Sequence, residues 1–140
     1  MYKIPIELIR MEPGGCHLML HAIINGWKAN VLIDTGASKS VMDLSRAKKY
    51  LDNPQIKAFE NHFTGMGAAQ IETWYAVIPS FAIGKTTLHD LQILLIDMHE
   101  IQQSYARHNL PRIDMVLGGD LLNKLGAVID YPNRMLMVNA

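Results

Sequence analysis

The sequence has a single cysteine, Cys16, among its 140 residues, which excludes an intrachain disulfide framework and a cysteine-based zinc cluster. It has no apolar run close to the roughly 18 residues that suggest a membrane span. It also lacks an excess of either charge, because thirteen Lys and Arg balance thirteen Asp and Glu. A neutral chain offers no overall electrostatic reason for nucleic acid or an anionic membrane to be its partner, and we expect neither.

The N-terminus and the composition are those of an ordinary folded chain. Met1–Glu7 carries a charge and a proline where a signal peptide needs an apolar stretch, so we expect a soluble, cytoplasmic protein unless a leader has been cut off. Hydrophobic residues make up 49% and charged residues 19%, which is enough apolar material for a buried core. The length predicts one domain over residues 1–140.

Alternating apolar and polar residues predict that most of the chain forms strands. Ile4, Ile6 and Leu8 alternate in this way, and Pro5 places their strand at the edge of a sheet, because proline cannot donate to a ladder. Asn25-Gly26 is a strong hairpin signal. It lies between two further extended runs, His17–Ile24 and Lys28–Ile33.

Short helices and hairpins follow along the rest of the chain. Asp43 is a suitable cap for a short helix that ends near Tyr50. The polar stretch Met98–His108 has neither glycine nor proline and predicts an inserted helix. A third short helix at Asp120–Leu122 is closed by Gly126. With hairpins expected over 59–78, around a glycine-rich tip, and over 127–138, the fold class is all-β with two or three short helices.

Asp34 is the first candidate functional residue, because it directly follows the apolar strand residues Val31-Leu32-Ile33. A carboxylate in a segment that leads into the core needs donors, a partner or a raised pKa. Gly36 lets the backbone approach a neighbour or ligand closely, and Ala37 keeps the site open. The plainer alternative is a turn in which Asp34 accepts a hydrogen bond from its own backbone.

Two further motifs favour chemistry at Asp34. Val116-Leu117-Gly118-Gly119-Asp120-Leu121-Leu122 is one, and Thr64-Gly65-Met66-Gly67-Ala68, at the tip of a predicted hairpin, is the other. In this order the three motifs resemble those of the retropepsin-like aspartic proteases, the single-domain relatives of pepsin, over about residues 22–138. The resemblance implies a single-lobe acid-protease β-barrel in which a glycine-tipped flap closes over the substrate. The predicted Met98–His108 insertion is foreign to the short retroviral enzymes and looks more like bacterial relatives.

The resemblance also implies roles for individual residues. Asp34 matches the catalytic aspartate, Thr35 the threonine whose hydroxyl braces the two halves of the site, and Gly36 the glycine whose backbone binds substrate. Gly118 matches the glycine behind the active-site loop. The substrate-binding residues that it implies are Gly36, Ala37, Ser38, Gly65, Met66 and Gly67. Many retroviral members have an aspartate at the position of Ser38 and an arginine at that of Gly119; both are absent here, which leaves no stranded charge.

A single Asp-Thr-Gly motif predicts a homodimer. Two carboxyl groups about 3 Å apart share one proton, so that one activates a water molecule while the other donates to the substrate carbonyl. Six other aspartates lack the Asp-Thr-Gly context, and we interpret them as caps, turns or surface charges: Asp43, Asp90, Asp97, Asp114, Asp120 and Asp130. The second carboxylate is then expected from Asp34 of another copy across a two-fold axis. Tyr2–Leu8 and Leu136–Asn139 are the candidate strands for joining the two chains.

The sequence leaves three functions open. The first is an aspartic endopeptidase that acts on peptides or proteins without a metal or organic cofactor. The second is a peptide-binding or dimerisation module of the same fold without turnover, and the third is a small β-barrel that carries a lipid or other ligand. His17 and His21 share one face of a predicted strand, but no third ligand is evident, so we expect no metal site.

Overall fold

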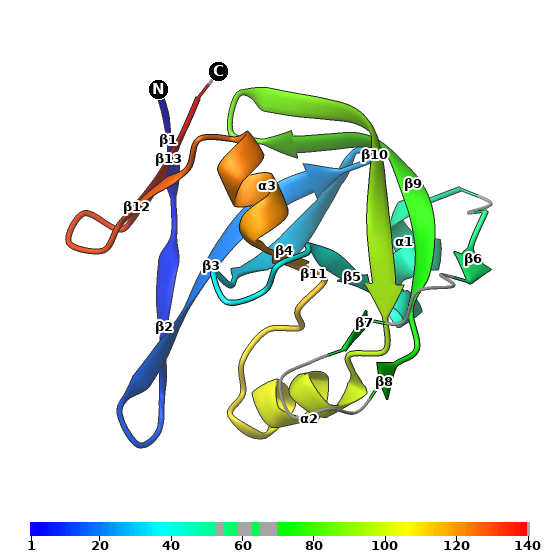
Figure 1. The fold of residues 1–140 in the computed structure, drawn as a ribbon. Coiled ribbons are helices and arrows are strands. Elements are labelled where there is room, and N and C mark those ends of the chain that lie inside the picture. The colour runs from blue at the N-terminus through cyan, green and yellow to red at the C-terminus, as the bar shows by residue number, and fades with distance from the viewer. Residues whose placement is uncertain (53–54, 59–62, 65–69, 140) are drawn as a thin grey trace.

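The computed structural model of the protein describes residues 1–52, 55–58, 63–64 and 70–139. Six strands form a closed barrel, because β9 pairs with β10 on one side and returns to β3 on the other (Figure 1). In barrel order these strands are β3 (Gly15–Ile24), β4 (Trp27–Ile33), β11 (Met115–Leu117), β5 (Val41–Asp43), β10 (Thr86–Ile96) and β9 (Trp74–Ile83). Two short strands, β2 (Glu7–Met11) and β6 (Lys57–Ala58), extend the same sheet at its ends. The predicted mostly-β fold is confirmed.

Local sequence signals explain the barrel's first hairpin. Ile24 pairs with Trp27, so Asn25 and Gly26 alone form the turn between β3 and β4. Both have positive φ angles, 48° and 87°, which is the backbone of the tight turn that Asn-Gly favours. The hairpin predicted from this dipeptide is confirmed.

The order of the barrel strands brings the two predicted active-site motifs together. β11 runs parallel to β4, with Val116 opposite Leu32 and Leu117 opposite Ile33. The carboxyl ends of parallel neighbours lie at the same edge of a sheet. Asp34, directly after β4, and Gly118, directly after β11, therefore lie side by side although 84 residues separate them along the chain.

A second, three-stranded sheet lies beside the barrel and contains both ends of the chain (Figure 1). Its order is β1 (Tyr2–Pro5), β13 (Met135–Val138) and β12 (Val128–Asp130), with β1 antiparallel to β13 and Ile4 opposite Leu136. Pro5 lies on an edge strand, as predicted. The expected continuous strand from Tyr2 to Leu8 is wrong, however, because the chain leaves this sheet at Ile6 and enters the barrel sheet as β2.

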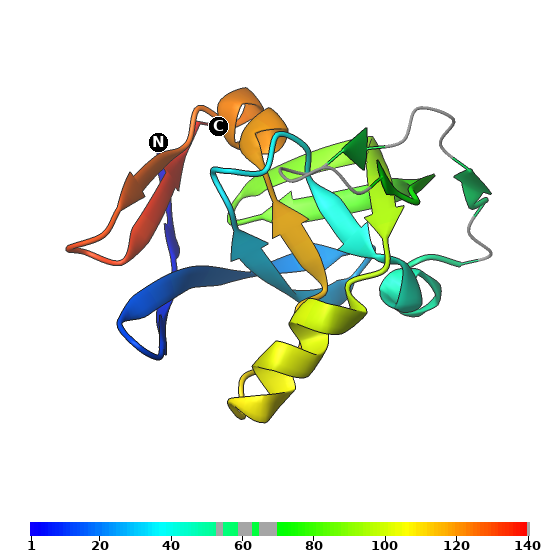
Figure 2. The same cartoon turned by 60° about the horizontal axis from the view of Figure 1, so that its bottom comes forward.

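The helices lie where the sequence predicts them. A short helical segment (Leu44–Arg46) leads into α1 (Ala47–Tyr50), and Asp43 caps it by accepting from the Ser45 N–H at 3.3 Å. The inserted helix α2 spans His99–Arg107 and extends from the barrel beyond the end of β10 (Figure 2). α3 spans Gly119–Lys124. The arms of the predicted flap hairpin, β7 (Phe63–Thr64) and β8 (Gln70–Ile71), pair antiparallel.

Two apolar clusters form the core. The larger fills the barrel and includes the fully buried side chains of Ile24, Ile78, Phe81 and Leu95. The smaller lies between α2 and the barrel; its buried members are Ile9, Met19, Leu32, Val41, Met98, Tyr105, Ile113 and Val116. Because Leu32, Val41 and Val116 belong to the strands that carry the active-site loops, the second cluster fixes α2 next to those loops.

Candidate active site

Asp34 lies at the start of a tight turn after β4. Its backbone N–H donates to the Leu117 carbonyl of the parallel neighbour β11 at 3.0 Å, which continues the strand pairing by one residue. Its carboxylate Oδ1 accepts from the Gly36 N–H at 2.9 Å, and its carbonyl accepts from the Ala37 N–H at 3.1 Å. A Cβ on Gly36 would lie 3.3 Å from the same carboxylate oxygen, so glycine leaves that oxygen room.

The Asp34 side chain is exposed in the single chain. The expectation that this segment carries its carboxylate into the core is therefore wrong: the strand residues Val31, Leu32 and Ile33 are buried, but the chain turns outward after them. The hydrogen bond from Gly36 is the one that the plainer turn interpretation predicted. That bond uses one acceptor site of Asp34 and leaves the remaining ones facing outward, where a second group can reach them.

The loop after β11 supports the Asp34 turn from behind. The Gly119 N–H donates to the Ala37 carbonyl at 2.7 Å, and the Gly118 N–H donates to Ser40 Oγ at 2.9 Å. A Cβ on Gly118 would lie 2.7 Å from the Ala37 carbonyl oxygen and 2.8 Å from that of Lys39. Only glycine fits between these two backbone segments, which agrees with the place that the sequence predicts for Gly118.

Ser40 and Asp120 hold the two loops together, and sequence reasoning missed this pair. The backbone N–H and the hydroxyl of Ser40 both donate to Asp120 Oδ1, at 2.9 and 2.7 Å. Asp120 is therefore more than the cap, turn residue or surface charge expected of it. Ser38 and Gly119 carry no charged side chain, and the Ser40–Asp120 bonds link the loops after β4 and β11. No sequence signal joins positions 80 residues apart.

The other predicted site residues are placed only in part. Thr35, Gly36 and Ser38 are exposed beside Asp34, and Ala37 is half-buried. Gly65, Met66 and Gly67, the predicted tip of the flap, lie outside the described residues. β7 and β8, on either side of that tip, are paired as a hairpin requires, with Thr64 opposite Gln70.

A groove of about 620 Å³ opens on one side of Asp34, and we call it the main groove. Asp34, Ala37 and Lys39 form one wall, and Val41 and Val116 contribute from the barrel. The lining is completed by Thr73, Leu94, Ile96 and residues 97–101, which lead into and begin α2. Most of these side chains are apolar. The charged residues besides Asp34 are Lys39, Asp97 and Glu100.

A smaller hollow of about 270 Å³ lies on the other side of Asp34, and we call it the side hollow. Thr35 joins Asp34 in its lining, and the second sheet contributes Ile129 and Tyr131. Asp34 and Ile101 line both the main groove and the side hollow. The carboxylate motif and the first turns of α2 therefore border both spaces together.

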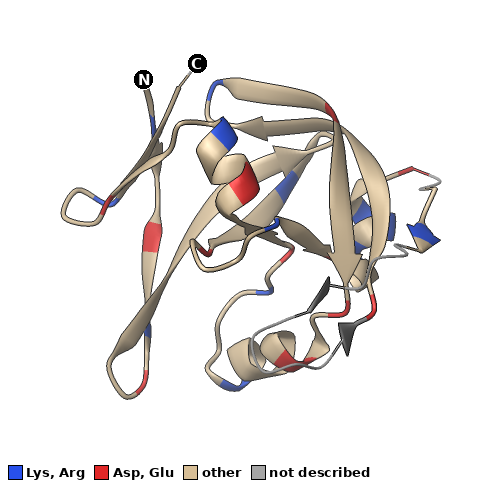
Figure 3. Cartoon of the chain, in the orientation of Figure 1, with Lys and Arg blue, Asp and Glu red and all other residues tan. Residues whose placement is uncertain are grey.

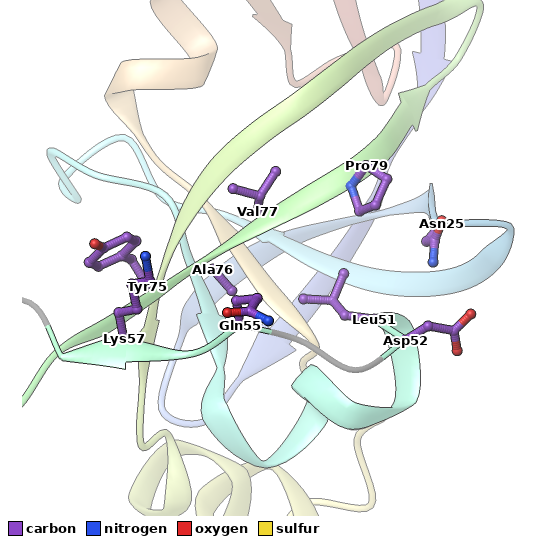
Figure 4. A pocket seen from close by; sticks show the side chains of 9 residues that line it. All are labelled: Asn25, Leu51, Asp52, Gln55, Lys57, Tyr75, Ala76, Val77 and Pro79. Atoms are coloured by element: carbon purple, nitrogen blue, oxygen red, sulfur yellow. The ribbon is translucent and has the colours of Figure 1, made fainter.

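A third hollow, of about 470 Å³, is separate from the Asp34 loop (Figure 4). Tyr75, Val77 and Pro79 of β9 line it, together with Leu51 and residues that follow α1. It shares no lining residue with either space beside Asp34. We call this third hollow the remote pocket. Because Asp34 does not line it, substitutions there serve as controls for substitutions at the candidate active site.

Two buried aspartates anchor the layer beneath the site. Asp114 accepts from Arg46 Nε at 2.8 Å and from the Asn30 N–H at 2.8 Å. Burial lowers the pKa of the Arg46 guanidinium, but its hydrogen bonds to Asp114 and Tyr50 outweigh this and raise the pKa above its ordinary value. Asp43 is 2% exposed and Asp114 3%, so both are structural groups inside the protein and neither is a surface charge.

The two histidines of β3 have different surroundings. The half-buried His17 ring stacks on Tyr105 of α2 with centroids 5.7 Å apart, and its Nδ1 shares a hydrogen bond with the Tyr105 hydroxyl. His21 is exposed and lies 3.8 Å from Glu7. Within the described part of the chain, no group of three or more His, Cys, Asp or Glu side chains is placed to hold a metal ion.

Charge is spread evenly over the chain. Lys and Arg, and Asp and Glu, are scattered over the whole ribbon (Figure 3). Over the described ranges, no helix has the length and apolar character that crossing a membrane requires.

Comparison with known proteins points to one family. The sequence profile of a family described as aspartyl protease matches residues 20–121. Among solved structures, EIAV protease in complex with the inhibitor HBY-793 is similar, with a TM-score of 0.61, 20% identity, and coverage of 87% of this chain and 99% of that one. A retropepsin-like aspartic protease from Rickettsia conorii has a TM-score of 0.57 and 22% identity, over 99% of this chain and 95% of that one.

A third similar structure is the retroviral protease-like domain of Ddi1 from Leishmania major, with a TM-score of 0.59, 16% identity and 88% coverage of both chains. No curated protein matches the sequence. At these identities the structures show the fold alone. The retropepsin-like fold that the three motifs predicted is confirmed.

Proposed function

The chain belongs to the aspartyl protease family. On that premise we propose that it is an endopeptidase. In this proposal a water molecule that hydrolyses the peptide bond is held by two Asp34 side chains, one from each of two copies. The observation that carries the proposal is the Asp34 turn: a carboxylate braced from behind by the Gly118 loop, exposed in front, and bordered by an apolar groove.

The proposed reaction needs no covalent intermediate. One carboxylate of the pair is ionised and takes a proton from the water molecule as it attacks the peptide carbonyl carbon. The other is protonated and donates to the carbonyl oxygen, and a proton is then returned to the leaving amine. Because protonating the first group or ionising the second removes a partner, the proposal predicts activity that falls on both sides of one pH optimum.

The second copy enters the proposal because one chain offers only one Asp-Thr-Gly motif. An exposed carboxylate with one backbone donor has acceptor positions left for a shared proton. A two-fold axis near Asp34 brings identical residues together, so one motif per chain is sufficient for a pair.

We propose a contact surface other than the terminal strands expected from the sequence. The terminal strands β1 and β13 pair with each other within one chain, which leaves β12 as a free edge on the side of β13 away from β1. Val128 and Tyr131, in and just after β12, are 45% and 48% exposed. Ile129 and Tyr131 also line the side hollow with Asp34 and Thr35. We therefore place the two-fold contact of the proposed dimer at β12.

Substrate binding follows from the main groove. An extended peptide lies against its apolar wall, between the Asp34 loop and the hairpin of β7 and β8, whose base near Thr73 lines the groove. In this proposal Gly36, Ala37 and Ser38 contact the peptide backbone. Gly65, Met66 and Gly67 stay the predicted tip that covers it, with the glycines allowing the tip to open and close.

An Asp34→Asn substitution tests the catalytic role. Asparagine has the same size and can still accept from the Gly36 N–H, so we expect the fold to be kept. We expect kcat/KM to fall by at least about 10³-fold, because the change removes both the base and the acid of the pair. The measurement is cleavage of a peptide library from about pH 4 to 7, because two carboxyl groups that share one proton titrate in the acidic range.

The matched control is Asp52→Asn, which makes the same change at the remote pocket and should leave cleavage as in the wild type. Equal cleavage by Asp34→Asn and wild type would contradict the proposed role. Peptide binding with no cleavage by either protein would instead identify a binding module of the same fold. An equal loss in Asp97→Asn, at the other groove aspartate, would point to a carboxylate pair within one chain.

A further inference from the structure

We propose that the start of α2, and Ile101 above all, decides which substrate side chain fits beside the scissile bond; this inference rests on the proposed protease function. Six of the thirteen residues that line the main groove are consecutive, 96–101, and no other segment contributes as many. The last three of them begin α2. Side-chain selection in this protein therefore depends on the segment that leads into and begins α2 more than on the Asp34 loop.

The lining next to α2 is apolar. Val41 and Val116 are each 8% exposed and Met98 5%, and they pack together in the smaller core cluster, with Ile96 and Ile101 beside them. An apolar wall of this kind accepts an aliphatic or aromatic side chain, because burial of apolar surface stabilises the complex. The substrate class is a peptide with a bulky apolar residue in the groove.

The charges at the rim do not make the selection. Lys39 stands on the Asp34 loop, and Glu100 and Asp97 stand on the α2 side. The Asp97 carboxylate accepts from the His99 N–H at 2.9 Å and so serves the start of the helix. With one cation, Lys39, and one further carboxylate, Glu100, left in the lining besides Asp34, size and apolar fit remain as the basis for discrimination.

Ile101 is the residue best placed to measure size. It is half-buried and, with Asp34, lines both the main groove and the side hollow. Its side chain therefore separates the two spaces next to the carboxylate. Shortening it joins them and makes room for a larger substrate side chain, whereas enlarging it narrows the groove.

The wall is held rigidly, as selection by size requires. The Gln102 side chain donates to Asp43 Oδ2 at 3.0 Å and accepts from the Ile113 N–H at 3.0 Å. The Met98 N–H donates to Asp43 Oδ1 at 3.4 Å. One turn further along the helix, Tyr105 is 1% exposed and bonded to His17. α2 is thus fixed to β5, to the segment before β11 and to β3 on either side of Ile101.

Two opposite substitutions at Ile101 test the inference. Peptides that differ only in having Val, Leu, Phe or Trp at one scanned position are compared by kcat/KM. Ile101→Ala should raise the ratio for Trp over Val about tenfold or more, since a few methylene groups in an apolar pocket are worth 10-fold to 200-fold. Ile101→Phe should lower the same ratio below that of the wild type.

The control is Ile23→Ala, at an isoleucine of β3 that is 43% exposed and lines none of the three hollows. It should leave the ratio unchanged. A Trp-to-Val ratio that is the same in the wild type and in both Ile101 variants would overturn the inference, and so would a shift in one direction for both.

A binding measurement separates failure of this inference from failure of the proposed function. The same peptides are bound to Asp34→Asn and to Asp34→Asn with Ile101→Ala, and affinities are read by fluorescence anisotropy. If the wild type cleaves no peptide but the Trp-to-Val affinity ratio rises with Ile101→Ala, the proposed activity is wrong and selection by Ile101 is supported. Affinities that do not depend on the size of the scanned residue, or no binding at all, would contradict selection by Ile101.

Discussion

Gly118 is confined by the backbone of Ala37 and Lys39 in the Asp34 loop. Its φ of −99° is open to any residue, so its requirement for glycine is steric and has nothing to do with a left-handed conformation. Neighbouring Gly119 is different, since a Cβ there would meet the Ala37 carbonyl oxygen at 3.5 Å, an ordinary contact. Of the two adjacent glycines, therefore, only Gly118 is required for steric reasons.

Gly118→Ala should lower the free energy of unfolding by about 1–3 kcal/mol, because the added methyl overpacks a site in which the nearest atoms are backbone. Gly119→Ala is the matched control; at the start of α3 we expect a change within about 0.5 kcal/mol. Both are measured by urea unfolding of the purified protein. Equal destabilisation by the two substitutions would contradict the steric explanation.

At the scale of one element, α2 combines a local signal with long-range anchoring. Its residues include no glycine or proline, which favours a helix. Its position against the barrel depends on Asp43, Tyr105 and the smaller core cluster. Burial raises the pKa of Tyr105 to about 12, and it also raises the pKa of Tyr50, on α1, to about 12.

The raised pKa of Tyr105 predicts how stability changes in alkali. A tyrosine in the unfolded chain titrates near pH 10, so the folded state holds this proton more tightly. The contribution of Tyr105 to the free energy of unfolding is complete below about pH 10 and is lost as the pH rises to about 12. Tyr105→Phe should make the fall of stability with pH shallower in this window, and Tyr50→Phe should do the same.

The slope is the quantity to compare, because Tyr105→Phe also removes the hydrogen bond to His17 and lowers stability at every pH. Urea unfolding at intervals between about pH 9 and 12 gives it. An unchanged slope in the Tyr105→Phe protein would contradict the burial that fixes α2.

At the scale of the whole molecule, the second sheet separates the ends of the chain from the barrel and leaves β12 as an edge. A sheet edge with exposed apolar side chains is ready to pair with another chain. Because Ile129 and Tyr131 line the side hollow with Asp34, the proposed contact at β12 puts the second copy close to Asp34. Assembly and activity are thus expected to be lost together.

Val128→Lys should weaken the proposed dimer at least tenfold, because symmetry places two new positive charges near each other across the contact. Sedimentation at micromolar concentration should show a monomer for the variant and a dimer for the wild type, with cleavage recovering as the variant is concentrated. The control is Val77→Lys, at a valine of β9 that is 50% exposed in the remote pocket. A fully active monomeric wild type would contradict the dimer.

Features that depend on neighbours in the chain could be predicted from the sequence. The Asn25-Gly26 turn, the Asp43 cap, α2 and the hydrogen bond within the Asp34 turn each involve residues a few positions apart, so residue type alone favours one backbone conformation. The three motifs in order were enough to indicate the family and its barrel. The dimer and the roles of the flap residues remain predictions.

Features that join distant residues were settled by packing in three dimensions. Ser40 bonds to Asp120, Asp43 bonds to Gln102, and β1 pairs with β13. These residues are brought together by the folding of the whole chain. No local preference encodes such long-range contacts. Ile101 shows the same limit. Its helix follows from its neighbours, whereas its place beside Asp34 exists only because the apolar side of α2 is buried against the strands that carry the active-site loops.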